Sequence, residues 1–339
     1  MPKIIIVLCA VLLTVESKTN LNNNVFLNRN PKPPSLASVK MISFNAWALP
    51  VWLPKTDQNN RYKKIPGVLL KSEADIICVQ EAFARKFRKR LLPTMEQDYF
   101  TYSDYKCNQR IVGPIKKDCH GGLITFSKFP IIEEQFYPYP LYDAMRIEER
   151  IGKKGFLLTT IKIERDTAYI INTHLYAGLK KYDEKHRMVQ IKHMHTILSD
   201  LGIMDEQIYL LGDLNVRHPD ISRERQEPFS QVYEYLSTTM GFMDTAPQLR
   251  YKDLTVDRDH NPYCGDKNGS QKLDYCLFKT PKHRLISINH SEVVFKGAES
   301  VSDHMGWSAI FNLNSDASTV EAIVMGDQRI SSQVINVQK

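Results

Sequence analysis

The chain has 339 residues, of which 42% are hydrophobic and 24% are charged. This composition supports a real hydrophobic core and excludes a disordered chain, and the length fits one large domain or two small ones. The formal net charge is +7, which favours nucleic acid, anionic lipid headgroups or phosphorylated substrates as partners. Charge alone does not separate these classes.

The first residues are typical of an export signal. Lys3 precedes the unbroken apolar run Ile4–Val15, which is too short to span a bilayer comfortably and fits the apolar core of a signal peptide. We predict a signal peptide over residues 1–17, with cleavage after Ser17 and a secreted or periplasmic location. A retained membrane anchor is the alternative interpretation. Residues 18–38 are rich in Asn, Pro and Ser and are predicted to form a flexible leader.

Removal of the signal peptide leaves an odd number of cysteines: Cys78, Cys107, Cys119, Cys264 and Cys276. In an oxidising compartment, an odd number implies at least one free or intermolecular thiol. Cys107 and Cys119 flank a polar, lysine-rich loop, so we predict a disulfide between them. Cys78 lies in an apolar run and is predicted to be a buried thiol.

Residues 39–315 contain no linker and no internal repeat, and they are predicted to form one domain followed by a tail over residues 316–339. Short runs rich in β-branched residues and bounded by polar turns are typical of buried strands. Such runs occupy Lys40–Asn45, Asp75–Gln80, Gly122–Phe126, Phe156–Ile161, Ala168–Asn172, Gln207–Leu211, Lys272–Phe278 and Trp307–Leu313.

Helical patterns alternate with these runs. Tyr182–Leu201 carries a stripe of apolar residues and is followed by Gly202 as a stop signal, while Pro228 is predicted to open a helix that ends before Gly241. A basic helix is predicted directly after Glu81, and we interpret its cations as a solvated face or as a contact with an anionic surface. Its cationic residues are Arg85, Lys86, Arg88, Lys89 and Arg90. The mixture predicts an α/β layered domain with two packed sheets.

Residues that can bind metal or move protons lie at or near the ends of the predicted strands. They are Asn45, Glu81, His174, Asp213, Asn215, Asp274, Asp303 and His304. Strand ends on a rigid sheet can be both exposed and accurately placed. Any one of these residues is more typical of an ordinary turn, so only the complete ordered set indicates a site.

That ordered set resembles the metal-dependent endonuclease, exonuclease and phosphatase superfamily from about Lys40 to Leu313. Within it, the chain is most similar to the neutral and bacterial sphingomyelinases. The motifs that carry this resemblance are Phe44–Pro50, Val79–Phe83, Gly121–Ile131, Lys154–Phe156, Thr173–Ala177, His186-Arg187 with Gln190, and Ser302–His304. The stretch between Pro247 and Lys272 departs from the pattern.

The resemblance implies a two-layer β-sandwich flanked by helices, the four-layer fold of deoxyribonucleases and sphingomyelinases. It also implies a metal site. The predicted metal-site residues are Glu81, Asn45, Asp213, Asn215, Asp303 and His304, and most of their donor atoms are oxygens. No Cys or His cluster has the spacing of a zinc site, so we predict Mg²⁺, with Mn²⁺ or Co²⁺ as possible substitutes.

Each predicted catalytic residue has a role. His304 is the candidate general base for an attacking water, because the pKa of an imidazole lies near neutrality. By resemblance, Asp274 fixes the tautomer of His304, and His174 stabilises charge or assists the leaving group. Asp213 belongs to the same centre, and Asn215 and Asn45 orient phosphate oxygens or metal-bound water. His193 and His195 are interpreted as structural or solvated.

The substrate is the least determined feature. The superfamily cleaves several kinds of phosphoester with one centre, so a sphingophospholipid at a membrane surface and a nucleic acid are both candidates. The apolar loop with Trp47, Trp52 and Leu53 follows Asn45, and core packing or contact with an interfacial substrate explains it equally well. We favour sphingomyelin hydrolysis over a secreted nuclease and over a non-catalytic binding protein. No protein partner is indicated.

Overall fold

The computed structural model describes residues 38–315 apart from 50–56, 104–108, 113–114, 119–120, 143–144, 164–165, 179, 227–228, 250–252, 266–269 and 282–284. The signal peptide, most of the leader and the tail lie outside the described residues, as do Cys107, Cys119, Trp52, Leu53 and Pro228. The corresponding expectations stay predictions. Among the described helices, none is long and apolar enough to cross a bilayer.

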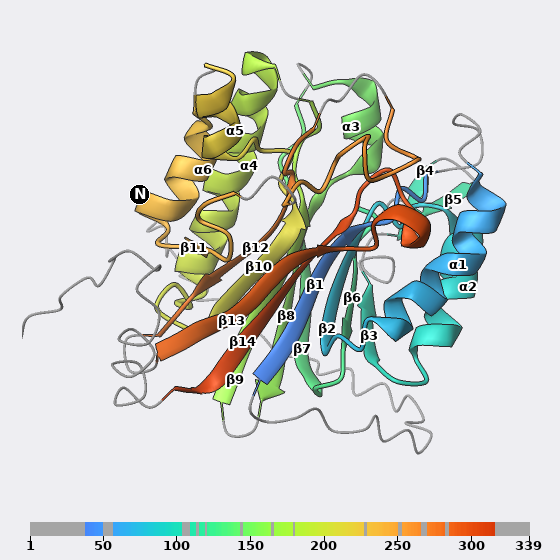
Figure 1. Ribbon diagram of the computed structural model, residues 1–339, viewed down its shortest axis with the longest axis horizontal. Coiled ribbons are helices and arrows are strands. Elements are labelled where there is room, and N and C mark those ends of the chain that lie inside the picture. Colours follow the sequence, from blue (N-terminus) through green and yellow to red (C-terminus); the bar gives the residue numbers. More distant parts are fainter. Residues whose placement is uncertain are drawn as a thin grey trace, which may run out of the picture. The chain divides into compact units, whose positions relative to one another are not determined.

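Two six-stranded sheets form the centre of the fold (Figure 1). The first has the order β13-β14-β1-β2-β6-β3. Its strands are β1 (Ser38–Asn45), β2 (Ile76–Gln80), β3 (Phe100–Ser103), β6 (Ile124–Ser127), β13 (Leu285–Val294) and β14 (Gly306–Ser315). In this sheet β1 pairs parallel to β2 and antiparallel to β14.

The second sheet has the order β11-β12-β10-β9-β8-β7. Its strands are β7 (Ile131–Pro138), β8 (Gly155–Ile163), β9 (Asp166–His174), β10 (Ile208–Asp213), β11 (Met243–Asp244) and β12 (Asp274–Lys279). Here β10 pairs parallel to β9 and antiparallel to β12. A separate hairpin joins β4 (Gln109–Val112) to β5 (Ile115–Asp118).

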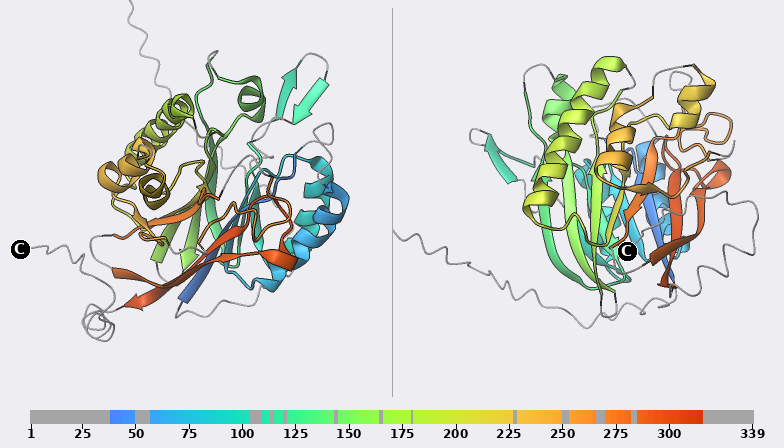
Figure 2. Two further views of the ribbon diagram at one scale, coloured as in Figure 1. Left: turned by 45° about the horizontal axis from the view of Figure 1, so that its top comes forward. Right: turned by 90° about the vertical axis from the view of Figure 1, so that its left-hand side faces the viewer.

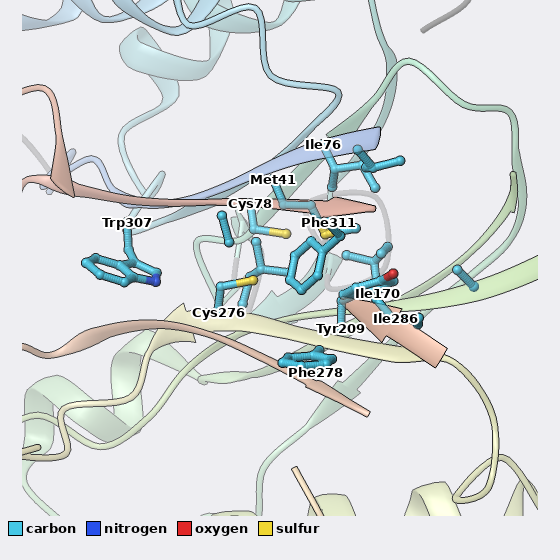
Figure 3. Packing of buried hydrophobic residues seen from close by; sticks show 14 of the residues in the cluster. Met41, Ile76, Cys78, Ile170, Tyr209, Cys276, Phe278, Ile286, Trp307 and Phe311 are labelled. Atoms are coloured by element: carbon cyan, nitrogen blue, oxygen red, sulfur yellow. The ribbon is translucent and has the colours of Figure 1, made fainter. Parts of the chain in front are cut away.

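The two sheets pack face to face through one hydrophobic cluster (Figure 3). Met41 and Cys78 from the first sheet face Tyr209 and Cys276 from the second, and all four side chains are fully buried. The ring of Tyr209 also meets that of Phe311 edge to face at 4.8 Å between centroids. The prediction that Cys78 is a buried thiol is confirmed.

Helices cover the outer face of each sheet (Figure 2). The first sheet packs against α1 (Gln58–Lys71) and α2 (Arg85–Met95). The second packs against α4 (Lys181–Asp200) and against α6 (Gln231–Glu234) with its π-helical extension η2 (Tyr235–Thr239). Short helices α3 (Ile147–Gly152) and α5 (Pro219–Glu224), and the 3₁₀ turn η3 (Gly297–Glu299), lie in the connections. The predicted sandwich with flanking helices is therefore confirmed.

All eight predicted strands are present, and each is an inner strand of its sheet. The four sheet strands without a prediction, β3, β7, β11 and β13, are the edges. An edge strand has a neighbouring strand on one side and solvent on the other, so more of its side chains can be polar and its sequence needs no continuous apolar run. Most of the β7 side chains are exposed, including Glu133 and Glu134.

Two helical details differ from the sequence interpretation. Arg88 does not belong to a solvated face: it is buried, and its guanidinium donates to the backbone carbonyls of Ala82 and Phe83 at 2.6 Å each. These bonds fix the chain directly after Glu81. Leu201 is exposed rather than packed on the α4 stripe, because the helix ends before it and Gly202 turns the chain at a φ of +69°.

Gly212→Ala and Gly67→Ala test the close approach of β9 to β10. A Cβ at Gly212 would lie 2.1 Å from the Thr173 carbonyl oxygen, so we expect a loss of about 1–3 kcal/mol in the free energy of unfolding. Gly67 lies in the exposed interior of α1 with no atom near its Cβ position, so alanine there is expected to add about 0.5–1 kcal/mol. Urea denaturation measures both. Equal stability of the two variants would contradict this description of the sheet.

Candidate active site

The predicted site residues meet at one edge of the sandwich, and strand direction explains why. Parallel strands β1 and β2 end there at Asn45 and Gln80, and parallel strands β9 and β10 end there at His174 and Asp213. Strand β12 is antiparallel to β10 and therefore begins at this edge, with Asp274. Strand β14 is antiparallel to β1, so the residues before it also reach the edge.

The register of the second sheet places three ionisable side chains in neighbouring positions. Asp213 is the register partner of His174 on one side and of Asp274 on the other. The Oδ2 atom of Asp213 lies 3.5 Å from Nε2 of His174 and 3.9 Å from Nε2 of His304. The pKa of Asp213 is raised to about 6, because burial and the charge of Asp274 outweigh the opposing charge of His304.

His304 and Asp274 form a hydrogen-bonded pair. Nδ1 of His304 lies 2.8 Å from Oδ2 of Asp274, whose side chain is fully buried. Burial alone would lower the pKa of His304, but the charges of Asp274 and Asp213 together with this hydrogen bond raise it well above its ordinary value. The carboxylate also fixes the tautomer, because Nδ1 must carry the donated proton and Nε2 is left to face the site.

A loop between Pro247 and Lys272, the stretch that departs from the family pattern, holds this pair in position. The Thr255 hydroxyl accepts the backbone N–H groups of Leu273 at 3.0 Å and Asp274 at 3.2 Å, and the Thr255 carbonyl accepts the N–H of Met305 at 2.7 Å. The Asn261 side chain donates to the carbonyl of Ser302 at 2.9 Å. The described part of the 247–272 region thus holds the backbone next to both residues of the pair, and no local sequence pattern predicts these contacts.

Asn45 links the two sheets across the site. Its Nδ2 donates to Oε1 of Glu81 at 3.2 Å and to Oδ2 of Asp213 at 3.0 Å, while its Oδ1 accepts the N–H of Trp47 at 2.9 Å. The second carboxylate oxygen of Glu81, Oε2, is buried and has no hydrogen-bond partner among the residues that the structure describes. A buried, unpaired carboxylate oxygen is costly unless a cation binds it.

The donor atoms near Glu81 fit the predicted divalent cation. Burial raises the pKa of Glu81, and burial likewise raises the pKa of Asp303 to about 6, with the charge of Glu81 adding to it. Two close carboxylates whose pKa values both rise indicate uncompensated negative charge. Among the described residues, Asp213, Asp274 and His304 also lie close enough to share an ion, but the bond between His304 and Asp274 already accounts for that spacing.

Three residues at this edge have left-handed backbone conformations: Trp47, Glu81 and Asn215, with φ of 46°, 55° and 50°. Such conformations are unfavourable for residues with a Cβ and occur preferentially at functional sites. Asn215 is held by two bonds, from its N–H to Oδ1 of Asp213 at 3.0 Å and from its Nδ2 to the carbonyl of Leu175 at 3.2 Å. Hydrogen bonds therefore connect four of the predicted ligands, Asn45, Glu81, Asp213 and Asn215, while Asp303 interacts with Glu81 through its charge.

Lys154 and Glu149 extend the site behind His174, and sequence reasoning gave neither a role. The Lys154 ammonium lies 3.1 Å from Nε2 of His174, 3.1 Å from Oε1 of Glu149 and 2.8 Å from the Leu175 carbonyl. Burial lowers the pKa of His174 well below its ordinary value, and the charges of Lys154 and His304 lower it further. His174 is therefore uncharged at neutral pH, and Lys154 is the cation on this side.

Helix α4 holds the loop that follows His174. The side chain of Gln190 accepts the N–H of Tyr176 at 2.8 Å, and the guanidinium of Arg187 donates to the Tyr176 carbonyl at 3.0 Å. These contacts give a physical reason for the His186-Arg187 and Gln190 motif. On the same helix, His195 contacts the Tyr235 hydroxyl at 2.8 Å and His193 packs beside Tyr139, which confirms their structural role.

The loop after Asn45 is described only in part. The Trp47 ring lies under the guanidinium of Arg61, whose Cζ is 4.6 Å from the ring centroid, and Arg61 also donates to the Trp47 carbonyl at 2.8 Å. Packing therefore explains Trp47. The other apolar residues of this loop that could meet a lipid lie outside the described residues.

Comparison with known proteins places this geometry in a family. The sequence model of the Endonuclease/Exonuclease/phosphatase family matches residues 42–304. Sphingomyelinase C 2 of Leptospira interrogans serogroup Icterohaemorrhagiae serovar Lai is 26% identical over 220 residues, which cover 59% of this chain and 34% of that protein. The chain thus spans about a third of that relative.

Solved structures share the fold. A beta toxin mutant from Staphylococcus aureus with bound magnesium ions superposes with a TM-score of 0.61 and 20% identity, over 80% of this chain and 99% of the other. TDP2 of D. rerio, complexed with a single strand DNA product, superposes with a TM-score of 0.56 and 15% identity, over 81% and 99%. At these identities the likeness concerns the fold alone.

Thr255→Val and Thr255→Ser test the clamp on Asp274. Valine keeps the shape of threonine but leaves two backbone N–H groups without their acceptor, whereas serine retains it. Loosening Asp274 weakens the contact that raises the pKa of His304, so NMR titration should give a lower His304 pKa in the valine variant than in the serine variant. An identical pKa in wild type and both variants would show that Thr255 does not position the pair.

Asp303→Asn tests the effect of the Asp303 charge on stability when EDTA removes divalent cations. The folded pKa of Asp303, at about 6, lies above its ordinary value, so this carboxyl stabilises the fold at low pH and loses that contribution as pH rises through about 6. Asparagine does not titrate. The Tm of the variant, measured by scanning fluorimetry, should therefore rise relative to wild type between about pH 5 and pH 7.5. A constant difference over this range would refute the assignment.

Proposed function

The chain belongs to the Endonuclease/Exonuclease/phosphatase family, and from this premise we propose that it is a phosphodiesterase that hydrolyses sphingomyelin, or a related sphingophospholipid, to ceramide and phosphocholine. The observation that carries the reaction type is the His304–Asp274 pair, whose charge acts on the buried carboxylate of Glu81. The substrate class is supported by relatives that bear the name sphingomyelinase.

His304 acts as general base in this proposal. Nε2 of His304 is the nitrogen left free to accept a proton from water, because Nδ1 is bonded to Asp274. Without a bound cation, the charges of Asp274 and Asp213 favour the protonated imidazole. With a divalent cation beside these carboxylates, their charge would be offset and Nε2 would be left free to accept the proton, and Asp274 would stabilise the imidazolium that then forms. The activated water attacks phosphorus in line with the ceramide oxygen, which departs. A positioned base of this kind typically contributes about 10²–10⁴-fold to the rate.

His174 and Lys154 serve the opposite side of the phosphate. Nε2 of His174 faces Asp213 and Glu81 and accepts from the ammonium of Lys154, so the neutral ring carries its proton on Nδ1. A phosphate beside these groups would meet the positive charge of Lys154. The sequence analysis gave the stabilisation of charge to His174. Because the pKa of His174 is lowered, the ring is neutral and Lys154 carries the positive charge. Lys154 also orients the ring by its hydrogen bond to Nε2.

Mg²⁺ is the proposed cofactor, held by Glu81 with Asn45, Asp213, Asn215 and Asp303 around it. When bound, it would withdraw charge from a phosphate oxygen and stabilise the departing alkoxide. Carboxylate and amide oxygens suit Mg²⁺, with Mn²⁺ or Co²⁺ as substitutes, because these are hard ligands. We further propose, from residues 1–17, that the enzyme is secreted or periplasmic and meets its substrate at a membrane surface.

Substrate choice and metal dependence are tested together. The purified protein should release phosphocholine from choline-labelled sphingomyelin with Mg²⁺ and lose this activity in EDTA, whereas duplex DNA should remain intact in both conditions. Readdition of Mg²⁺ should restore activity, and Zn²⁺ alone should not, because the ligands are oxygens. Cleavage of DNA with intact sphingomyelin would replace the proposal by the secreted nuclease. Full activity in EDTA would show that the reaction does not require a divalent metal.

His304→Ala tests the assignment of the general base. We expect kcat to fall by at least about 10²-fold, with the fold and Mg²⁺ affinity nearly unchanged, because glutamate and amide oxygens rather than the imidazole hold the ion. Asp274→Asn should also lower kcat by disfavouring the productive tautomer. The control is His290→Ala, since His290 is half exposed on edge strand β13. A folded, metal-binding His304→Ala protein with normal turnover would disprove the role.

A further inference from the structure

Helix α3 has the reverse of the usual amphipathic pattern. One of its two glutamates, Glu149, is buried, while Ile147 and Ile151, one helical turn apart, are 70% and 59% exposed. A short helix of a folded domain normally turns its isoleucines inward and its acids outward, since burial of apolar surface is the main driving force of packing. The exposed pair therefore needs an explanation beyond folding.

The orientation of α3 is fixed by polar contacts on its inner side. Oε1 of Glu149 accepts from Lys154 Nζ at 3.1 Å and from the N–H of Ala177 at 3.1 Å. Arg146, the residue before the helix, donates to the Ala177 carbonyl at 2.5 Å, and its guanidinium lies 5.0 Å from the centroid of the Tyr176 ring. These bonds prevent the helix from rotating its isoleucines into the protein.

We infer that the outer face of α3, formed by Ile147 and Ile151, is a docking surface for a lipid bilayer. The inference rests on the proposed function, in which the substrate is a lipid. The helix stands at the same edge of the sandwich as the active site (Figure 1), and Lys154 joins its inner side to His174. A bilayer that receives Ile147 and Ile151 would consequently lie beside the mouth of the site.

The charges around α3 suit a membrane surface. Arg146 and Arg150 flank Ile147 and Ile151 in the sequence and are exposed, and the helix ends at the half-exposed Lys153. Glu148 is the exposed acid of the helix, and Arg146 lies 3.6 Å from it. An apolar pair surrounded mainly by cations is typical of segments that insert side chains between headgroups while arginine and lysine contact phosphates.

A protein partner fits this face less well. A stable protein interface buries about 800 Å² on each partner, and two isoleucine side chains on a six-residue helix supply far less. Shallow insertion of two aliphatic side chains into a bilayer needs no such area, because each buried methylene contributes separately to partitioning.

The double variant Ile147→Ser/Ile151→Ser tests the inference against Ile132→Ser. Ile132 is 59% exposed at the start of β7, at the end of the sandwich opposite the active site, and is the matched control. Binding is measured by co-sedimentation with vesicles of phosphatidylcholine and a minor fraction of phosphatidylserine, without sphingomyelin and in EDTA. We expect the double variant to bind about tenfold more weakly or worse, and the control to bind like wild type.

A second measurement separates docking from catalysis. Turnover of a soluble, short-chain choline phosphodiester should be unchanged in the double variant, while turnover of sphingomyelin in vesicles should fall with vesicle binding. Wild-type protein that does not bind the vesicles, or a double variant that binds as wild type does, would overturn the docking surface. Because binding is measured without substrate or metal, failure to hydrolyse sphingomyelin would refute the proposed function separately.

Discussion

Strand register in the second sheet is the constraint on which the active site depends. Parallel pairing of β9 with β10 and antiparallel pairing of β10 with β12 bring Asp213 beside both His174 and Asp274. The sheets pack through a buried apolar cluster, so this register cannot slip without moving core residues to the opposite face. Hydrophobic packing therefore supplies the accuracy with which the polar residues are placed.

The same packing makes the site electrostatically unfavourable by itself. Asp213 and Asp303 have pKa values raised to about 6, and one buried oxygen of Glu81 finds no hydrogen-bond partner in the described part of the chain. A folded protein tolerates such groups where a ligand compensates for them. A divalent cation and a phosphodiester together would provide the missing charges and acceptors, which is why the arrangement favours metal-assisted hydrolysis over a purely structural role.

Contacts outside the sheets hold the catalytic side chains from behind. Thr255 binds the backbone next to both members of the His304–Asp274 pair, and Lys154 binds His174 together with the carbonyl that follows it. Most of these contacts involve backbone atoms. They fix positions that strand register leaves open, because His304 precedes β14 and His174 is the last residue of β9.

Inner strands and their terminal residues could be predicted from the sequence, and edge strands could not. Strand β10 is buried on both faces, so its sequence is a nearly continuous apolar run that ends in Asp213. Most side chains of β7 are exposed to solvent, including Glu133 and Glu134, so its sequence has no such run. The role of Thr255 was also beyond prediction, since its contact with Asp274 joins a loop to a strand and leaves no local pattern. Arg88 was misassigned because the sequence does not distinguish a cation that caps backbone carbonyls from one in solvent.

The position of bond cleavage tests the central claim most directly, namely that water activated at His304 attacks phosphorus and releases ceramide. Sphingomyelin is hydrolysed by the Mg²⁺-loaded protein in ¹⁸O-labelled water, and both products are analysed by mass spectrometry. The account predicts one ¹⁸O atom in phosphocholine for each turnover and none in ceramide. Free choline with a ceramide phosphate, or phosphocholine without the label, would contradict it.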